Sequence, residues 1–209
     1  MISVPRLYAV VDSVFFSTTE DLAAFAEQLI EGGCPVLQYR NKLGHARVML
    51  EQARELRRQL RARAPASHVR LIMNDRADLC LIAEFEGVHI GQDDLASESV
   101  RGIIGAERWL GVSTHNPEQV AEADSTSSDY LAIGPVFSTS SKDRPDPVLG
   151  LDGVRRARSF TRKPLVAIGG ITRANAASVI EAGADSVAVI SDLLRDPRKS
   201  AEEFFRILR

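Results

Sequence analysis

A short polar run places amide and cationic side chains at alternate positions. Gln38, Arg40 and Lys42 are each two residues apart, and alternate residues of a β-strand share one face. Two cations carried to the inside of a fold are costly unless they pair with carboxylates or bind an anion. The run therefore predicts an anion-binding site, and an ion pair from Arg40 to a neighbouring carboxylate is the structural alternative.

Two aspartates would complete such a site with a metal ion. Asp75 follows the apolar run Arg70–Asn74, and Asp94 follows the run Gly87–Gly91. On adjacent strands, which lie about 4.8 Å apart, the two carboxylates would reach a common point. Mg²⁺ is often held by one or two carboxylates together with phosphate oxygens and water. We therefore expect a Mg²⁺–diphosphate site, while capping of a helix by each aspartate is the alternative.

The elements that would position these residues recur down the chain. Eight short apolar runs are candidate buried strands, and most are followed by helical patterning. Eight alternating β/α units of roughly 25 residues predict an α/β fold, the single-domain (β/α)8 TIM barrel, over residues 1–209. Ligands bind such barrels at the carboxyl ends of the strands. The runs are Leu7–Val11, Val36–Arg40, Arg70–Asn74, Gly87–Gly91, Trp109–Ser113, Tyr130–Gly134, Pro164–Gly170 and Ser186–Ser191.

Two helices are explicit in the pattern. Over Ala46–Ala64 the apolar residues return at helical spacing and leave the arginines largely on another face. A second helix is predicted over Ala174–Ala182, with Thr172 as its N-cap and Gly183 as its C-cap. Both follow predicted strands and would lie outside the barrel.

Further candidates lie at the ends of the later strands. The loops after the last two strands of this fold recurrently bind phosphate, and here they contain Gly169-Gly170 and Ile190-Ser191. Glycine lets backbone N–H groups approach an anion, although a tight turn alone would also use it. Ser113 can donate to a bound oxyanion, and His89 is expected to be a hydrogen-bonded core histidine. The aperiodic stretch Phe137–Gly150 is expected to be a functional lid.

The composition excludes several classes of protein. A net charge of -2 gives no support for a nucleic-acid surface, and no apolar run approaches the ~20 residues of a membrane span. Cys34 and Cys80 lie among apolar neighbours, as free thiols in a reducing cytosol do. We expect a cytoplasmic protein with small-molecule partners, without nucleic-acid or membrane partners, and with assembly into a homo-oligomer left open.

Seven motifs, in order, resemble those of the thiamine phosphate synthase family. They cover the chain from Gln38 to Ser191 at compatible spacing. One such motif is a weak signal, whereas seven in sequence are specific. They are Gln38–Lys42, Asn74-Asp75, Gly87–Asp94, Gly111–His115, Gly134–Phe137, Val166–Ile171 and Val189–Ser191.

The resemblance implies a transferase that joins 4-amino-2-methyl-5-pyrimidinylmethyl diphosphate to a thiazole ethyl phosphate or its carboxylated form. The residues implied for the pyrimidine diphosphate are Gln38, Arg40, Lys42, Asn74, Ser113 and Lys142. Those implied for the thiazole phosphate are Thr139, Ser140, Ser141, Gly170, Ile190 and Ser191. Asp75 and Asp94 would bind Mg²⁺, and the catalytic groups would be Arg40, Lys42, Ser113 and Lys142, which stabilise the leaving diphosphate.

The chain departs from the family pattern in two places, and two other functions compete with the transferase. The departures are the loop after the sixth predicted strand, at Ser141 and over residues 143–147, and Asp93, where glutamate is usual. Ser141 stands where the family often has threonine, and it keeps the hydroxyl. The competing functions are a thiazole tautomerase-like isomerase on the same barrel and a non-catalytic barrel that binds a phosphate ligand. Neither isomerisation nor simple phosphate binding has a use for a diphosphate–Mg²⁺ site.

Overall fold

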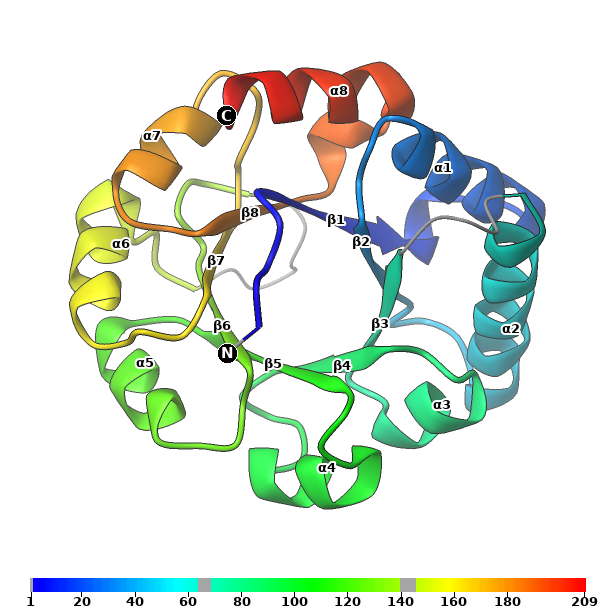
Figure 1. Cartoon of the computed structure of the whole chain (residues 1–209), viewed down its shortest axis with the longest axis horizontal. Helices are drawn as coiled ribbons and strands as arrows, with labels where there is room; N and C mark the ends of the chain where they lie inside the picture. Colours follow the sequence, from blue (N-terminus) through cyan, green and yellow to red (C-terminus); the bar gives the residue numbers. More distant parts are fainter. Residues whose placement is uncertain (1, 64–68, 140–145) are drawn as a thin grey trace.

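Eight parallel strands form a closed barrel in chain order, and a ring of helices surrounds it (Figure 1). The computed structural model describes residues 2–63, 69–139 and 146–209. β8 returns to pair with β1, with Leu7 opposite Val187, so the sheet has no free edge. The predicted TIM barrel is confirmed. The strands are β1 (Leu7–Asp12), β2 (Val36–Arg40), β3 (Arg70–Asn74), β4 (Gly87–Ile90), β5 (Trp109–Thr114), β6 (Tyr130–Ile133), β7 (Leu165–Ile168) and β8 (Ser186–Val189).

A helix follows each strand and covers the outer face of the sheet. Within the described residues, none of these helices is long and apolar enough to cross a membrane. The helices are α1 (Thr19–Glu31), α2 (Ala46–Arg63), α3 (Ala77–Ile82), α4 (Ser97–Ile104), α5 (Pro117–Asp124), α6 (Gly150–Ser159), α7 (Ala176–Glu181) and α8 (Pro197–Ile207), with short 3-10 helices at η1 (Ser13–Phe15) and η2 (Ser191–Leu193).

Side chains along each strand alternate between two hydrophobic clusters. Leu37 and Tyr39 of β2 belong to the cluster between sheet and helices, whereas Val36 belongs to the cluster inside the barrel. Gln38 and Arg40 therefore share the inward face with Val36, as the spacing predicts.

Strand β7 is shorter than the apolar run Pro164–Gly170 that predicts it. Pro164 has no N–H to give to the ladder. Gly169 and Gly170 have φ angles of 102° and 63°, which end the extended backbone at Ile168.

Helix α7 also differs from its prediction. It spans Ala176–Glu181, and the prediction of Thr172 as its N-cap is wrong. Asn175 occupies the N-cap, and its Oδ1 accepts a hydrogen bond from the Thr172 N–H at 2.8 Å, so a polar turn takes up the residues before the helix. Ala182 is the C-cap and Gly183 follows it with a φ of 110°.

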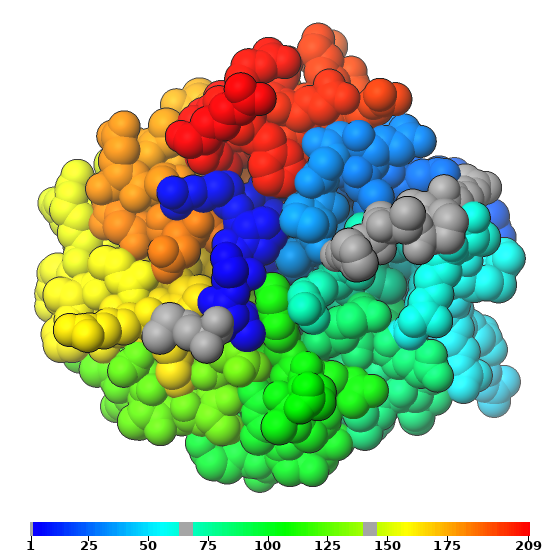
Figure 2. Space-filling view, in the orientation of Figure 1, coloured from blue at the N-terminus to red at the C-terminus, as the bar shows by residue number. Residues whose placement is uncertain are grey.

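The amino-terminal segment closes one end of the barrel. Ile2 and Val4 pack against the cluster inside the barrel, and this dark blue segment lies across the centre of the face in Figure 2. The opposite face is formed by the loops that follow the carboxyl ends of the strands. This carboxyl-terminal face is the end at which (β/α)8 barrels bind their ligands.

In the part of the chain that the structure describes, one polar arrangement occurs three times near the starts of the strands. Asp129, just before β6, accepts hydrogen bonds from the Leu110 N–H at 2.7 Å and from Arg101 of α4 at 2.6 Å. In each arrangement, a carboxylate just before one strand accepts from the backbone N–H at the start of the preceding strand. The same carboxylate pairs with an arginine of the helix that comes before that preceding strand. The equivalents are Glu86 with Leu71 and Arg57, and Asp185 with Leu165 and Arg158.

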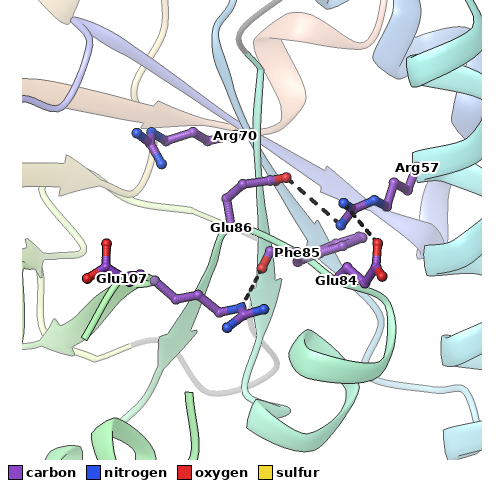
Figure 3. Close-up of a pocket in the computed structure, with 7 residues that line it drawn as sticks. Arg57, Arg70, Glu84, Phe85, Glu86 and Glu107 are labelled. Carbon is purple, nitrogen blue, oxygen red and sulfur yellow. Dashed lines mark hydrogen bonds and ion pairs between the residues drawn. The ribbon is translucent and has the colours of Figure 1, made fainter. Parts of the chain in front are cut away.

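The Glu86 arrangement borders a cavity of about 440 Å³. Figure 3 shows Arg57 directed at Glu84 and Glu86 in this cavity. Of its lining residues, Arg70, Glu86 and Arg108 stand at or next to the starts of β3, β4 and β5, so the cavity lies at the amino-terminal end of the barrel. Its arginines and glutamates balance in charge, which fits a structural role.

Removal of the Asp129 carboxylate should destabilise the barrel. Asp129→Ala leaves the Leu110 N–H and the Arg101 guanidinium without their shared acceptor, and we expect the free energy of unfolding to fall by about 2 kcal/mol. Urea unfolding measures the loss. Asp152→Ala is the control, because 91% of that side chain is exposed and its ion pair is with Arg155 of its own helix. Equal losses in the two variants would contradict the proposed role of Asp129.

Candidate active site

The polar run of β2 ends at the carboxyl-terminal face, where each of its cations is paired. Arg40 forms an ion pair with Asp12, its register partner at the end of β1, and Asp12 is 3% exposed. Lys42 forms an ion pair with Asp75, which follows β3. The structural alternative for Arg40 is therefore present. A guanidinium has five N–H donors, so the pair fixes Arg40 at the mouth and leaves donors for a ligand.

The two predicted metal ligands face each other. Asp75 lies in the left-handed region with a φ of 62°, and its N–H donates to the His89 carbonyl at 2.8 Å. Burial raises the pKa of the Asp75 carboxyl; the cation of Lys42 opposes this, and the neighbouring Asp94 carboxyl raises it further. The neighbouring strands thus bring both carboxylates to one point.

Neither aspartate caps a helix, so the capping alternative is wrong. The N-caps of α3 and α4 are Arg76 and Ala96. Asp94 instead accepts a hydrogen bond from the Gly91 N–H at 2.7 Å, which holds the loop after β4 in place.

Asn74, the last residue of β3, carries an unpaired donor. Its side chain shares the inward face with Ile72, and the residue is 8% exposed. Within the described residues, its Nδ2 has no hydrogen-bond partner. Buried polar groups are nearly always paired, so an unpaired amide next to Asp75 indicates a place for a ligand acceptor.

A chain of hydrogen bonds crosses the interior of the barrel from Gln38 to Ser113. Gln38 donates to the Tyr8 hydroxyl at 2.9 Å, and that hydroxyl contacts the Tyr130 hydroxyl at 2.9 Å. The Tyr130 hydroxyl lies 3.1 Å from His89 Nδ1, and His89 Nε2 lies 2.8 Å from Ser113 Oγ. The expectation of a hydrogen-bonded core histidine is confirmed.

Sequence reasoning did not assign a role to Tyr8 or Tyr130. Their positions along the strands could have indicated a role. Both share the inward face of their strands with apolar residues, where a buried hydroxyl needs a hydrogen-bond partner. Burial also lowers the pKa of His89 to about 4, so its imidazole is neutral at neutral pH.

The two glycines after β7 meet both a conformational and a spatial demand. Gly170 has a φ of 63°, and a Cβ on it would lie 2.4 Å from the Ser138 carbonyl oxygen. The close approach that glycine permits here is to the chain's own segment after β6. The tight turn, which was the structural alternative for Gly169-Gly170, is therefore present. The same two glycines belong to the predicted phosphate-binding loop.

The loops after β7 and β8 are joined to each other. The Arg173 N–H and side chain both donate to Asp192, the N–H at 2.8 Å. Ile190 is half-buried beside the barrel interior, and Ser191 is exposed at the start of η2. These residues lie at the same end of the barrel as Asp75 and Asp94.

The remaining candidates lie in the segment after β6. Thr139 is half-buried. Ser140, Ser141 and Lys142 lie outside the described residues, as do all of residues 140–145 of the predicted lid Phe137–Gly150. Helix α6 begins at Gly150, where that predicted lid ends.

Fold and site together define a TIM barrel whose carboxyl-terminal face gathers paired cations, two facing carboxylates and one unpaired buried amide. The family model for thiamine monophosphate synthase matches residues 7–193. A thiamine-phosphate synthase of Koribacter versatilis is 57% identical over 210 residues, which cover 99% of this chain and 97% of the relative. One of Chloroflexus aurantiacus is 45% identical, over 89% of this chain and 83% of the relative.

A solved structure gives the same relationship. Thiamine phosphate pyrophosphorylase from Pyrococcus furiosus superposes with a TM-score of 0.83 at 31% identity, and the match covers 97% of this chain and 95% of that chain. The chain therefore belongs to the thiamine monophosphate synthase family, and it is an enzyme.

The buried imidazole of His89 should make stability depend on pH. Its pKa is about 4 in the folded protein against the ordinary 6.5, so the unfolded chain binds an extra proton between these values. The free energy of unfolding should then fall by about 3 kcal/mol as the pH drops through this window, with no further loss from His89 below it. Urea unfolding of the metal-free protein at several pH values measures the fall.

The comparison with variants isolates the histidine. His89→Gln should flatten the pH dependence across that window. His45→Gln, at an exposed position before α2, should keep the wild-type profile. A His89→Gln protein with the wild-type pH dependence would contradict the assignment.

Proposed function

We propose that the protein joins an aminopyrimidinylmethyl diphosphate to a thiazole ethyl phosphate, in its plain or carboxylated form, and releases diphosphate. The observation that carries this proposal is the gathering of cations, facing carboxylates and an unpaired buried amide at the ends of β2, β3 and β4. Membership of the family supports the reaction class.

The deeper part of the site suits the pyrimidine diphosphate. Gln38 and Asn74 are buried side chains on the inward face and offer amide groups to a heterocycle. Arg40, Lys42 and Ser113 stand at the strand ends, where they would meet the diphosphate. We assign Lys142 to the same group by family resemblance.

The shallower part suits the thiazole phosphate. Gly170, Ile190 and Ser191 lie on the loops after β7 and β8, the recurrent phosphate site of this fold. Family resemblance adds Thr139, Ser140 and Ser141. The two ligands would then meet between the loops.

The donor set fits Mg²⁺. Within the described residues no group of three or more His, Cys, Asp and Glu side chains could hold a metal ion. Two facing carboxylates, Asp75 and Asp94, are the hard oxygen ligands that Mg²⁺ takes together with phosphate oxygens and water. When bound, Mg²⁺ would neutralise negative charge on the diphosphate.

The protein's own groups would drive the departure of diphosphate. Arg40, Lys42, Ser113 and Lys142 would stabilise the charge that develops on oxygen as the C–O bond of the pyrimidine substrate breaks. The aminopyrimidine stabilises the resulting methylene cation, and the thiazole nitrogen attacks it. No protein nucleophile is needed in this scheme, and exclusion of water protects the cation.

Several coarser assignments accompany the reaction. We propose that residues 1–209 form one domain and that the protein acts in the cytoplasm, where the free thiols of Cys34 and Cys80 would persist. The isomerase and the non-catalytic alternatives leave Asp75 and Asp94 without a task.

The shared-metal assignment predicts a large loss of turnover. Asp75→Asn or Asp94→Asn keeps the size of the side chain and removes its charge, so kcat should fall by at least ~10²-fold. Steady-state kinetics over a range of Mg²⁺ concentrations measure the fall. Asp93→Asn is the matched control, because Asp93 is exposed beside Asp94, and its kcat should stay near that of the wild type. Near-normal rates for Asp75→Asn at saturating Mg²⁺ would reject a shared metal.

The close approach at Gly170 predicts an effect selective for one substrate. A methyl group on Gly170 would displace Phe137 and Ser138, which lead to Thr139. Gly170→Ala should therefore raise the KM for the thiazole phosphate several-fold more than that for the pyrimidine diphosphate. Gly102→Ala is the control, because a Cβ there would meet nothing within 4 Å. Equal changes in both KM values would indicate that the thiazole phosphate binds elsewhere.

A further inference from the structure

The hydrogen-bond chain inside the barrel links two proposed substrate contacts through three residues that the proposed mechanism does not use. Gln38 and Ser113 are its ends, and Tyr8, Tyr130 and His89 are its links. We propose that these three links are positioning residues, which turn the Ser113 hydroxyl proton outward toward the leaving diphosphate. The inference rests on the proposed function only in taking Ser113 as a diphosphate contact.

The direction of the chain follows from the donor at its start. An amide nitrogen can only donate, so the Tyr8 hydroxyl accepts from Gln38. Its own proton is buried and needs an acceptor, and the Tyr130 hydroxyl is the group that it contacts there. Tyr130 in turn gives its proton to His89 Nδ1, the ring nitrogen that it contacts. Nδ1 is then an acceptor.

The tautomer of His89 extends this direction of hydrogen-bond donation to Ser113. A neutral imidazole with Nδ1 as acceptor bears its proton on Nε2. That proton is donated to Ser113 Oγ, 2.8 Å away. The serine oxygen accepts inside the barrel, so its own proton remains for an acceptor at the mouth. The opposite tautomer would draw the serine proton inward and leave only oxygen lone pairs toward the diphosphate.

The surroundings keep this arrangement unique. Tyr8, Tyr130 and His89 are 2%, 0% and 8% exposed, so water does not compete for their hydrogen bonds. Burial also raises the pKa values of both tyrosines, so both hydroxyls keep their protons at neutral pH.

Glycine at position 111 leaves room for the contact between His89 and Tyr130. His89, Gly111 and Tyr130 are register partners on β4, β5 and β6, so the His89–Tyr130 contact passes over Gly111. A Cβ on Gly111 would lie 2.3 Å from the Tyr130 hydroxyl and 2.4 Å from His89 Nδ1. The absence of a side chain on β5 therefore permits the link that sets the tautomer.

Nitrogen NMR of the protein tests the direction of the chain. In wild-type protein labelled with ¹⁵N-histidine, His89 should show a protonated Nε2 and an unprotonated Nδ1 at neutral pH; His89→Gln identifies its signals among the four histidines. A protonated Nδ1 in the wild type would overturn the proposal whatever the variants do. In Tyr130→Phe the Nε2-protonated form should lose its dominance, because Nδ1 no longer has a donor.

Kinetics of three variants test the link to catalysis. Tyr130→Phe keeps the ring and removes the hydroxyl, and it should lower kcat by about fivefold or more, with a smaller change in either KM. In a Ser113→Ala background the same change should have no further effect, because the hydroxyl that it directs is gone. Tyr39→Phe is the matched control: its buried hydroxyl faces Gln52 on the helix side of the sheet, and its kcat should stay at the wild-type value.

The outcomes separate the two proposals. If Ser113→Ala keeps the wild-type kcat, the assignment of Ser113 to the diphosphate fails. If Ser113→Ala is impaired while Tyr130→Phe is not, or if the two losses multiply in the double variant, the positioning role fails. Thermal unfolding midpoints of all variants distinguish lost folding from lost positioning, and the wild-type tautomer decides the matter if Tyr130→Phe does not fold.

Discussion

Closure of the eight-stranded sheet is the constraint on which the rest of the molecule depends. Alternation along each strand sends every second side chain into an interior that the helices and the amino-terminal segment shut off from water. Polar groups placed there must find partners among themselves. The tyrosine and histidine contacts meet this demand low in the barrel, and Asn74 leaves it unmet near the mouth.

The charges at the mouth are balanced in pairs before any ligand arrives. Asp12 neutralises Arg40 and Asp75 neutralises Lys42. Such pairing holds long cationic side chains in place at a low cost in free energy, compared with a cluster of bare cations. On the proposed assignment, a diphosphate would meet the remaining donors of Arg40, and a divalent cation on Asp75 would free Lys42 for the phosphate.

Much of the architecture could be predicted from the sequence. The pattern of apolar residues shows which residues of a strand share a face, and its eightfold repetition indicates a closed barrel. The inward direction of Gln38 and Arg40 and the meeting of Asp75 with Asp94 follow from that pattern. The boundaries of the elements were harder to predict. Asn175 accepts the Thr172 N–H, and this local hydrogen bond moves the start of α7.

Contacts between distant segments could not be predicted from the sequence. Nothing in the run around Tyr130 shows that its hydroxyl meets His89, since the link needs Gly111 between them. The partner of Arg40 was likewise unnamed, although Asp12 ends the neighbouring strand on the same face. Such pairs depend on three-dimensional register, which periodicity constrains without fixing side-chain partners.

The closed amino-terminal end has a kinetic consequence. With Ile2 and Val4 packed against the interior cluster, molecules enter and leave through one mouth. On the proposed assignment the pyrimidine contacts Gln38 and Asn74 are buried, whereas Ser191 is exposed. On that assignment one passage serves both ligands, so the pyrimidine diphosphate would bind first, and a thiazole phosphate bound first would obstruct its entry.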